Sequence, residues 1–398
     1  MEQEPKYSKK KVIALMLVAS ALTCVLLLVA FGRTFGFSLG RFRELQTYSA
    51  LRDEIDELYI GDVDEEAIFD AAMYATVDSL GDEWSYYMSP EEYSEYLDWS
   101  YNQYMGIGIS VDADEDTGGL RIVFVYKTSG ADKAGLEIDD VLLSVDGTDI
   151  TQMAFDEVMG LLDGQEGDFI EFKVLKNTGE IEFVSCSYEM VFTDPISYRQ
   201  LESNLSIGYI KIENFDWGVA GSFIDAVEHL AAFGAESFIF DVRFNGGGFV
   251  DEMTEILDYL LPHCEVFVSV DKSGRESITY SDDFCFEYPA VVLVNSYSYS
   301  AAEYFAATLG EYGYAQTVGE HTTGKNRSQV TIELPNKGAL HISSGEYLTP
   351  NRVSLYDNGG MKPDYEVALD EESGYLLYYG ELAEEDDTQL LRAIELLS

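Results

Sequence analysis

Hydrophobic positions change their spacing along the chain, and each change predicts a different kind of structure. Residues 12–31 form an unbroken run of 20 uncharged residues, close to the about 20 that a helix needs to span a bilayer. Between 39 and 99 hydrophobic residues recur at helical spacing. Short strands and turns follow over 104–190, and strands alternate with helices beyond 191. The last pattern favours a sheet covered by helices.

Turn and cap residues place individual elements within this outline. The segment 89–92 (SPEE) is a good helix start, with a serine cap, a proline first and carboxylates in the first turn. Asp146 and Gly147 mark a tight hairpin turn, and Gly135 stops a short helix. The remaining predicted elements are a helix over 155–162, a hairpin turning at 177–179, strands over 207–212, 237–242 and 290–295, and helices over 219–233 and 251–261.

The apolar run at 12–31 is interpreted as an uncleaved membrane anchor. Positive charges lie on both sides of it, at Lys6, Lys9, Lys10 and Lys11 before the run and at Arg33, Arg41 and Arg43 after it. The lysines favour a cytoplasmic N-terminus, although the arginines weaken the contrast. A cleaved signal peptide is the competing interpretation, but the run is longer than usual and no clean Ala-x-Ala site follows. We therefore expect the rest of the chain to face outside the cytoplasm.

The patterns together predict an α/β multidomain protein. We expect a cytoplasmic tail and transmembrane anchor at 1–33, a helical arm at 34–103, a strand-rich domain at 104–190, an α/β domain at 191–375 and a C-terminal helix at 376–398. The arm is expected to be independent and to hold no part of a reaction centre.

Composition excludes some functions. The formal net charge of −49 repels nucleic acid phosphate, so DNA or RNA binding is not expected. No CxxC pair, HExxH motif or His/Cys cluster indicates a metal, and we expect no cofactor. Cys264 and Cys285 are expected to be buried free thiols, with a disulfide between them as the alternative.

Ser300 is the candidate nucleophile. It follows the strand at 290–295 and opens a helix, an arrangement that exposes a hydroxyl beside backbone amides suited to an oxyanion. The competing interpretation is a capping box, in which Ser300 and Glu303 exchange hydrogen bonds at the start of a helix. Ser296 and Ser298 are rival nucleophiles in the same run.

Lys325 is the candidate general base, 25 residues after Ser300. A lysine must be desolvated, with no carboxylate partner nearby, to accept a proton near neutral pH. Gln329 follows by four residues, on the same face of a helix or strand, and would orient the amine without charging it. The glycine run at 246–248 would supply an oxyanion donor. A histidine triad through His321 and surface roles for the lysine and glutamine are the alternatives.

Several blocks of sequence resemble one family, the carboxyl-terminal processing peptidases (tail-specific serine proteases of family S41 with a PDZ domain). They are LGDEWSYYM with SPEEY at 80–93, 106–150, DVRFNGGG at 241–248, SAAE at 300–303 with GEHTTGK at 319–325 and Gln329, and 347–364 (YLTP through KPD). The resemblance implies that Ser300 is the nucleophile, Lys325 the base and Gln329 its partner. It also implies that the amides of Gly247 and Ala301 form the oxyanion site.

The same resemblance implies a PDZ domain (an α+β partial barrel) at 104–190 and a ClpP/crotonase-like core in the peptidase domain. The peptide-binding loop of the PDZ domain would consist of Met105, Gly106, Ile107, Gly108 and Ile109. Departures from the family pattern are the lack of a proline at 128–131, the aromatic character of 85–88, and Gly246 where proline is common.

The sequence therefore predicts a membrane-anchored serine endopeptidase that acts outside the cytoplasm. Its substrates would be proteins and peptides with free C-termini, captured by strand addition to the PDZ groove. The resemblance also implies a homodimer formed through the helical arms. Two alternatives are an inert PDZ adaptor and a peptidase held inactive by its own PDZ domain.

Overall fold

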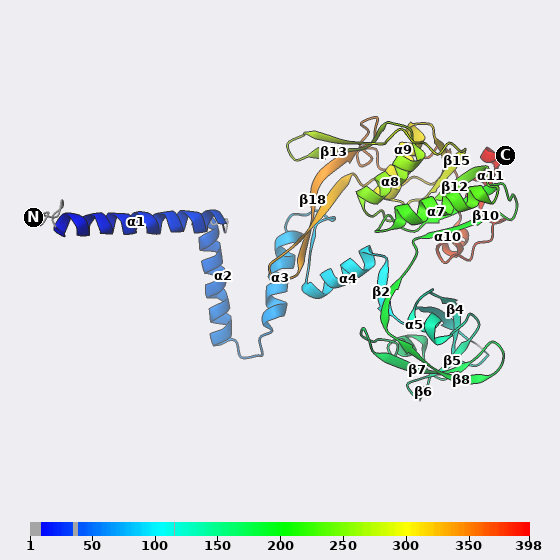
Figure 1. Cartoon of the computed structure of the whole chain (residues 1–398), viewed down its shortest axis with the longest axis horizontal. Coiled ribbons are helices and arrows are strands. Elements are labelled where there is room, and N and C mark those ends of the chain that lie inside the picture. Colours follow the sequence, from blue (N-terminus) through cyan, green and yellow to red (C-terminus); the bar gives the residue numbers. More distant parts are fainter. Residues whose placement is uncertain (1–8, 35–38, 115) are drawn as a thin grey trace, which may run out of the picture. The chain divides into compact units, whose positions relative to one another are not determined.

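The computed structural model describes residues 9–34, 39–114 and 116–398 (Figure 1). The chain divides into two compact units, 1–72 and 73–398. Within the described residues of the first unit lie helices α1 (Lys9–Thr34) and α2 (Leu39–Leu58) and the start of α3 (Glu65–Asp78). Arg52 of α2 forms an ion pair with Glu65 at the start of α3.

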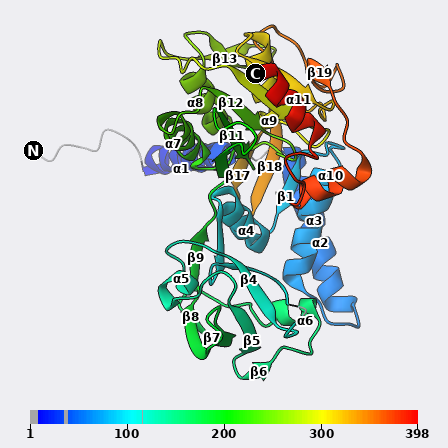
Figure 2. The ribbon, with the colours of Figure 1, turned by 90° about the vertical axis from the view of Figure 1, so that its right-hand side faces the viewer.

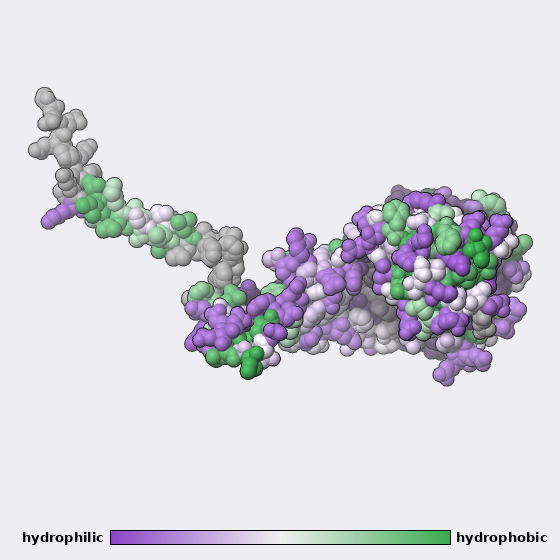
Figure 3. All heavy atoms as spheres, turned by 90° about the horizontal axis from the view of Figure 1, so that it is seen from below, coloured by the Kyte–Doolittle hydropathy of each residue, from purple (hydrophilic) through white to green (hydrophobic). Residues whose placement is uncertain are grey.

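Helix α1 carries the apolar run. The window Lys10–Leu27 has a mean hydropathy of 2.0 and is long and apolar enough to cross a membrane, a test that an N-terminal signal sequence also passes. The side chains of residues 10–27 are exposed, and Figure 3 shows apolar residues along this helix. Lys6, on which the expected orientation partly depends, lies outside the described residues.

The strand-rich domain is built around an antiparallel sheet. Its strands run in the order β3 (Ile109–Ala113), β4 (Leu120–Val125), β5 (Val141–Val145), β7 (Phe169–Leu175) and β8 (Ile181–Ser187), and β6 (Thr148–Asp149) pairs with β5. Helices α5 (Gly130–Ala134) and α6 (Phe155–Met159) complete the domain. Strands β2 (Gln103–Gly106) and β9 (Glu189–Phe192) form a separate antiparallel pair. Strand β3 therefore lies at an edge of its sheet.

The turn and the helix end predicted for this domain are confirmed. Asp146 and Gly147 both have positive φ and join β5 to β6, and Gly135 adopts the left-handed conformation that ends α5. The helix predicted over 155–162 is shorter, because α6 ends at Met159 and the glycines at 160 and 164 follow it.

The α/β domain contains a central sheet. Its strands run in the order β10 (Ile196–Gln200), β11 (Ile207–Ile212), β12 (Ser237–Asp241), β15 (Ala290–Val294), β16 (Ala315–Gly319) and β19 (Tyr365–Glu366). Strands β11 to β19 are parallel to their neighbours, and β10 is antiparallel to β11. The mixed α/β prediction agrees with this arrangement, and the predicted strand 207–212 coincides with β11.

Helices cover both faces of the central sheet. On one face Phe238 and Phe240 pack in a core with residues of α7 (Val219–Ala232), α8 (Val250–Leu260) and α9 (Ala301–Glu311). On the other face Ile239 packs with Leu390 and Ala393 of α11 (Thr388–Leu397). Successive strand residues thus alternate between two cores, as the pleat of a strand requires. Figure 2 shows α11 and the pair α7 and α8 on opposite sides of the strands.

A second sheet corrects the expectation that the arm is independent. Its strands run in the order β1 (Tyr86–Met88), β18 (Ala339–Leu348), β13 (Glu265–Asp271) and β14 (Glu276–Tyr280), and β17 (Arg327–Glu333) also pairs with β18. Strand β1 comes from the predicted arm and pairs with β18, Tyr86 opposite His341. Residues 86–88 of the predicted arm are therefore part of this second sheet.

The start of helix α4 agrees with the prediction, whereas the C-terminal helix does not. Helix α4 (Pro90–Ser100) begins as predicted. The Ser89 hydroxyl accepts from the Glu92 amide at 3.2 Å, and the Glu92 carboxylate accepts from the Ser89 amide at 2.8 Å.

The prediction of a single helix at 376–398 is wrong. The structure has α10 (Glu371–Tyr378) and α11, separated by a loop in which Gly380 has positive φ.

A buried ion-pair network joins α11 to the end of β12. Arg243 donates to Asp241 through Nη2 (2.6 Å), and its Nη1 donates to Asp387 and Gln389 (3.1 and 3.0 Å). All four side chains are buried, and Asp387 also caps α11. The network fixes the turn that follows β12, where Asn245 and the glycine run begin.

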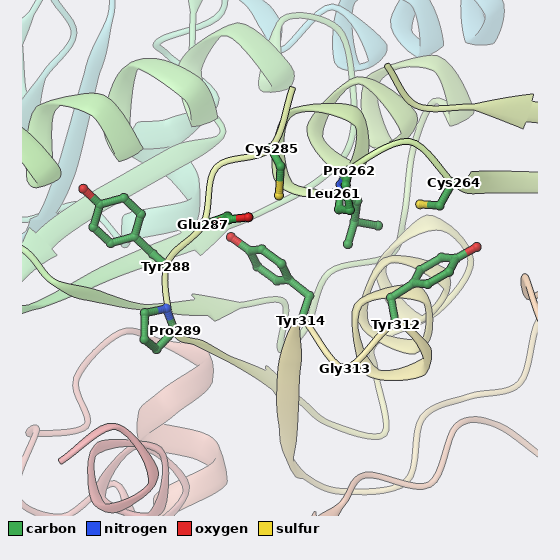
Figure 4. A pocket seen from close by; sticks show the side chains of 10 residues that line it. All are labelled: Leu261, Pro262, Cys264, Cys285, Glu287, Tyr288, Pro289, Tyr312, Gly313 and Tyr314. Atoms are coloured by element: carbon green, nitrogen blue, oxygen red, sulfur yellow. The ribbon is translucent and has the colours of Figure 1, made fainter. Parts of the chain in front are cut away.

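Cys264 and Cys285 line one cavity of about 430 Å³ (Figure 4). The structure has both as free thiols. The Cys285 thiol donates to the Leu260 carbonyl at 3.1 Å, and burial raises its pKa. Three tyrosines share the cavity, which lies among the residues that follow α8 and α9 rather than with Ser300.

The network around Arg243 yields a stability prediction. We expect Arg243→Leu to lower the free energy of unfolding by about 3–5 kcal/mol, because two buried carboxylates lose their counter-charge. Urea unfolding measures the loss. Arg275→Ala is the matched control, since the exposed pair of Arg275 with Asp271 is worth less than about 1 kcal/mol. Equal losses in the two variants would contradict the assigned role.

Candidate active site

Ser300 lies at a strained turn between β15 and α9. Its φ of 58° and ψ of −123° are unusual for a residue with a side chain, and such conformations cost about 1–3 kcal/mol. The side chain makes no capping hydrogen bond to α9. The hydroxyl therefore lines a cavity of about 1060 Å³ at the N-terminus of the helix, instead of closing the helix as a cap would.

The Glu303 carboxylate connects Ser300 to Lys325. Oε2 accepts from the Lys325 amide at 2.7 Å and from the Ser300 amide at 3.3 Å. Oε1 accepts from the Gly324 amide at 3.0 Å and the Thr322 hydroxyl at 2.7 Å. Burial raises the pKa of Glu303, and these hydrogen bonds oppose that shift. One buried side chain thus holds the start of α9 against the 322–325 loop.

Lys325 lines the same cavity and is 9% exposed. Burial lowers the pKa of its amine to about 8, while the charges of Asp82, Glu303 and Glu83 oppose the shift. Asp82 is paired with Arg327 at 2.8 Å, and no ion pair involves Lys325 in the described part of the chain. The desolvation therefore agrees with what a lysine base requires. No hydrogen bond joins Nζ to the Ser300 hydroxyl among the described residues.

Gln329 lines the cavity from β17 but does not contact the amine through a hydrogen bond in the described residues. Its Nε2 donates to the Arg327 carbonyl at 3.0 Å and to the Ser343 hydroxyl at 3.2 Å. The structure thus places Gln329 beside Lys325 in one cavity, and its orienting role stays a prediction.

The two expected oxyanion donors lie next to Ser300. A Cβ built on Gly247, whose φ is +94°, would stand 2.7 Å from the Ser300 Cβ and 3.0 Å from the Ala301 nitrogen. The Ala301 amide has no acceptor among the described residues. The Gly247 amide donates to Asn245 Oδ1 at 2.8 Å. One donor is therefore free, and the other is satisfied by a side chain of its own turn.

The rival residues lie elsewhere. Ser298 is fully buried, and its hydroxyl donates to the Val242 carbonyl at 2.7 Å. Ser296 is exposed and lines a different cavity, beside Tyr297. His321 is not among the residues that line the cavity of Ser300. The histidine that does line it, His341, has its pKa lowered to about 4 by burial and then by Lys325.

Comparison with known proteins identifies the domains. The family model of peptidase family S41 matches residues 206–367, and that of the PDZ domain matches residues 100–175. The segment 206–367 is thus similar to peptidase family S41, and the segment 100–175 to the PDZ domain. The matched peptidase segment contains Ser300, Lys325 and Gln329.

Curated proteins that are similar to this chain carry related names. Carboxyl-terminal-processing peptidase 1, chloroplastic, of Arabidopsis thaliana is 30% identical over 298 residues, which cover 72% of this chain and 60% of that protein. The carboxyl-terminal-processing protease of Synechocystis sp. is 27% identical over 316 residues, covering 78% and 72%. A solved structure described as an S41 protease from Bacteroides fragilis has a TM-score of 0.52 at 18% identity and covers 81% of this chain and 89% of its own. That likeness shows the fold alone.

Sequence reasoning missed two residues of the cavity that Ser300 and Lys325 line. Trp84 places its ring centroid 4.3 Å from the Lys325 Nζ, although the arm was expected to stay outside the reaction centre. The only signal for it was its place in the LGDEWSYYM block. Asp216 lines the cavity, is 3% exposed and has an Oδ2 with no partner. Burial, followed by the charge of Glu252, raises the pKa of Asp216 to about 7. No spacing pointed to Asp216.

The expected PDZ loop joins β2 to β3. Met105 and Gly106 end β2, Ile107 and Gly108 form the connection, and Ile109 begins β3 at the edge of its sheet. Gly108 has a φ of +85°, and a Cβ there would stand 2.1 Å from the Ser129 Cβ. The loop therefore needs glycine at this position, and the strand beside it is an edge strand of its sheet.

The contact between Gly247 and Ser300 yields a prediction. We expect Gly247→Ala to lower kcat/KM by at least about a hundredfold, because the new methyl group would push the turn away from the nucleophile and remove an oxyanion donor. Cleavage of an unfolded protein measures the loss. Gly221→Ala in α7 is the control, since its Cβ would meet no atom within 4 Å. A Gly247→Ala rate within twofold of the wild type would contradict the assignment.

Proposed function

We propose that this chain is a membrane-anchored serine endopeptidase that cleaves proteins near their C-termini outside the cytoplasm. The observation that carries the proposal is that Ser300 and Lys325 line one cavity, where the amine is desolvated and has no ion pair with any described residue. Serine peptidases need a base for the hydroxyl, and a neutral lysine amine supplies one.

The reaction begins with the neutral Lys325 amine. It accepts the Ser300 proton as Oγ attacks the substrate carbonyl, and the resulting oxyanion receives hydrogen bonds from the Ala301 and Gly247 amides. The lysine then gives the proton to the leaving amine, and water hydrolyses the acyl-enzyme by the reverse sequence. Two adjustments precede attack: Nζ must come within hydrogen-bond reach of Oγ, and the Gly247 amide must turn from Asn245 to the substrate.

Substrate capture is proposed for the PDZ domain. A free C-terminal segment would add as a strand to β3, with its carboxylate at the loop 105–109. The names of the two plant and cyanobacterial relatives support processing at the carboxyl terminus. Helix α1 would be the anchor, and the arm would join two copies into a homodimer. The ClpP/crotonase-like core and the PDZ domain limits 104–190 belong to the same proposal.

The alternative is a PDZ adaptor with an inert peptidase domain. The open oxyanion donor at Ala301 and the strained, uncapped Ser300 argue against it, because neither feature stabilises the fold.

Nucleophile and base variants test the proposal. Wild-type enzyme is expected to digest an unfolded protein, and Ser300→Ala and Lys325→Ala are each expected to lose at least about a thousandfold in kcat/KM. Ser296→Ala, which removes the exposed rival, should stay within twofold. Fragment analysis by mass spectrometry measures the rates. A wild type without turnover would favour the adaptor instead.

The pKa of Lys325 predicts a pH profile. Because the base works only when neutral, kcat/KM should rise with pH through an apparent pKa near 8 and level off above it. At pH 7 only about a tenth of the enzyme would hold a neutral amine. Initial rates from pH 5.5 to 9.5 on one substrate give the curve. A profile that is flat above pH 6 would exclude this lysine as the base.

A further inference from the structure

Two aromatic rings border the Lys325 amine. The Trp84 centroid lies 4.3 Å from Nζ and the Tyr299 centroid 5.9 Å from it, and the two rings lie 5.9 Å apart. Tyr299 directly precedes the nucleophile, whereas Trp84 comes from the segment that leads into β1. No hydrogen bond or ion pair of Nζ competes with these ring contacts among the described residues.

The ring contact favours one protonation state. An aromatic face attracts an ammonium group through its quadrupole but has no such attraction for a neutral amine. Trp84 therefore favours the form of Lys325 that cannot act as a base, and it holds Nζ on the ring rather than at the Ser300 hydroxyl.

The position of Trp84 is set by contacts to the strands around the cavity. Asp82 pairs with Arg327 of β17, and the Ser85 hydroxyl accepts from the Ser343 amide of β18 at 3.0 Å. The backbone on both sides of Trp84 is thus tied to the sheet. Its ring is part of the cavity wall that a substrate must contact.

We propose that Trp84 is a positioning residue that holds the Lys325 ammonium in a resting place on its ring, and that a substrate entering the cavity displaces the ring and releases the amine to Ser300. The proposal rests on the function proposed above. On release, the ammonium gives its proton to water before it accepts the proton of Ser300. Substrate binding and activation of the base are then one event, and the empty enzyme stays weakly nucleophilic.

Several charged and titratable groups face Lys325, and the test must separate Trp84 from them. They are Asp82 and Glu83 of the same segment, Glu303 of α9, and His341 of β18. The pKa of His341 is lowered to about 4, and the pKa of Asp216, which lines the same cavity, is raised to about 7. Because Asp216 also changes its charge near pH 7, the Lys325→Met variant is the comparison that assigns a change in Trp84 fluorescence to the lysine.

The first experiment detects the contact without catalysis. The chain has three tryptophans, so Trp99→Phe with Trp217→Phe leaves Trp84 as the only one. In the full chain in detergent, with Ser300→Ala added, the fluorescence of Trp84 should titrate with a midpoint near pH 8. Adding Lys325→Met should abolish that titration. A titration that is absent, or that persists without the lysine, overturns the proposal.

The second experiment measures the consequence for the base. Without the ring, the acid limb of kcat/KM in Trp84→Leu should move about half a unit to one unit lower in pH, and Trp84→Phe should fall between it and the wild type. At pH 7 the shift alone raises the neutral fraction of Lys325 about threefold to fivefold. Trp99→Leu, which removes a cavity aromatic that does not contact Lys325, should leave the limb in place.

The outcomes separate the two proposals. If Trp84→Leu loses rate equally at every pH, or if Trp99→Leu shifts the limb as much, Trp84 serves the wall of the cavity and not the base. If the wild type shows no hydrolysis while the fluorescence titration follows Lys325, the resting contact stands and the peptidase function fails.

Discussion

One buried carboxylate keeps the two halves of the candidate site together. Glu303 is fully buried in α9, and its oxygens accept from the Ser300 and Lys325 amides as well as from Thr322 and Gly324. A buried charge without partners would be very costly, so the donors and the carboxylate hold each other in place. The start of α9 and the 322–325 loop both donate to Glu303, and this shared acceptor determines how far Ser300 lies from Lys325.

Two opposite electrostatic effects act on the Lys325 amine. The chain carries a net charge of −49, and three nearby carboxylates favour a charged Lys325. Burial of the amine outweighs them and lowers the pKa of Lys325 to about 8. Among the described residues no ion pair of Lys325 opposes this effect, so a lysine can titrate near neutral pH inside a very acidic protein.

Local features of the fold, such as strand β15 and the start of helix α4, could be predicted from the sequence. Runs such as VVLVN and the SPEE start are decided by neighbouring residues, which is why β15 and α4 appeared where they were expected. The spacing of Ser300 and Lys325 identified a pair that the fold brings into one cavity. These predictions needed only short-range physics and the family resemblance.

The spacing of hydrophobic residues could not predict which distant strands pair with each other. Strand β1 has three residues, too few for a period to show, and it forms only because β18 offers an edge more than two hundred positions later. Trp84 reaches Lys325 through that pairing, so its contact was invisible in the sequence. The division of the C-terminal segment into α10 and α11 likewise depends on Asp387, which meets Arg243 in the folded core.

The contact between Arg243 and Asp387 affects the order in which parts of the structure can form during synthesis. Arg243 sits beside the turn that carries Gly247, and its partner Asp387 comes 144 residues later in the chain. A ribosome makes the turn long before it makes the residue that anchors it. A nascent chain therefore carries the turn at 245–248 without the carboxylate that fixes Arg243 beside it, until Asp387 has emerged and docked.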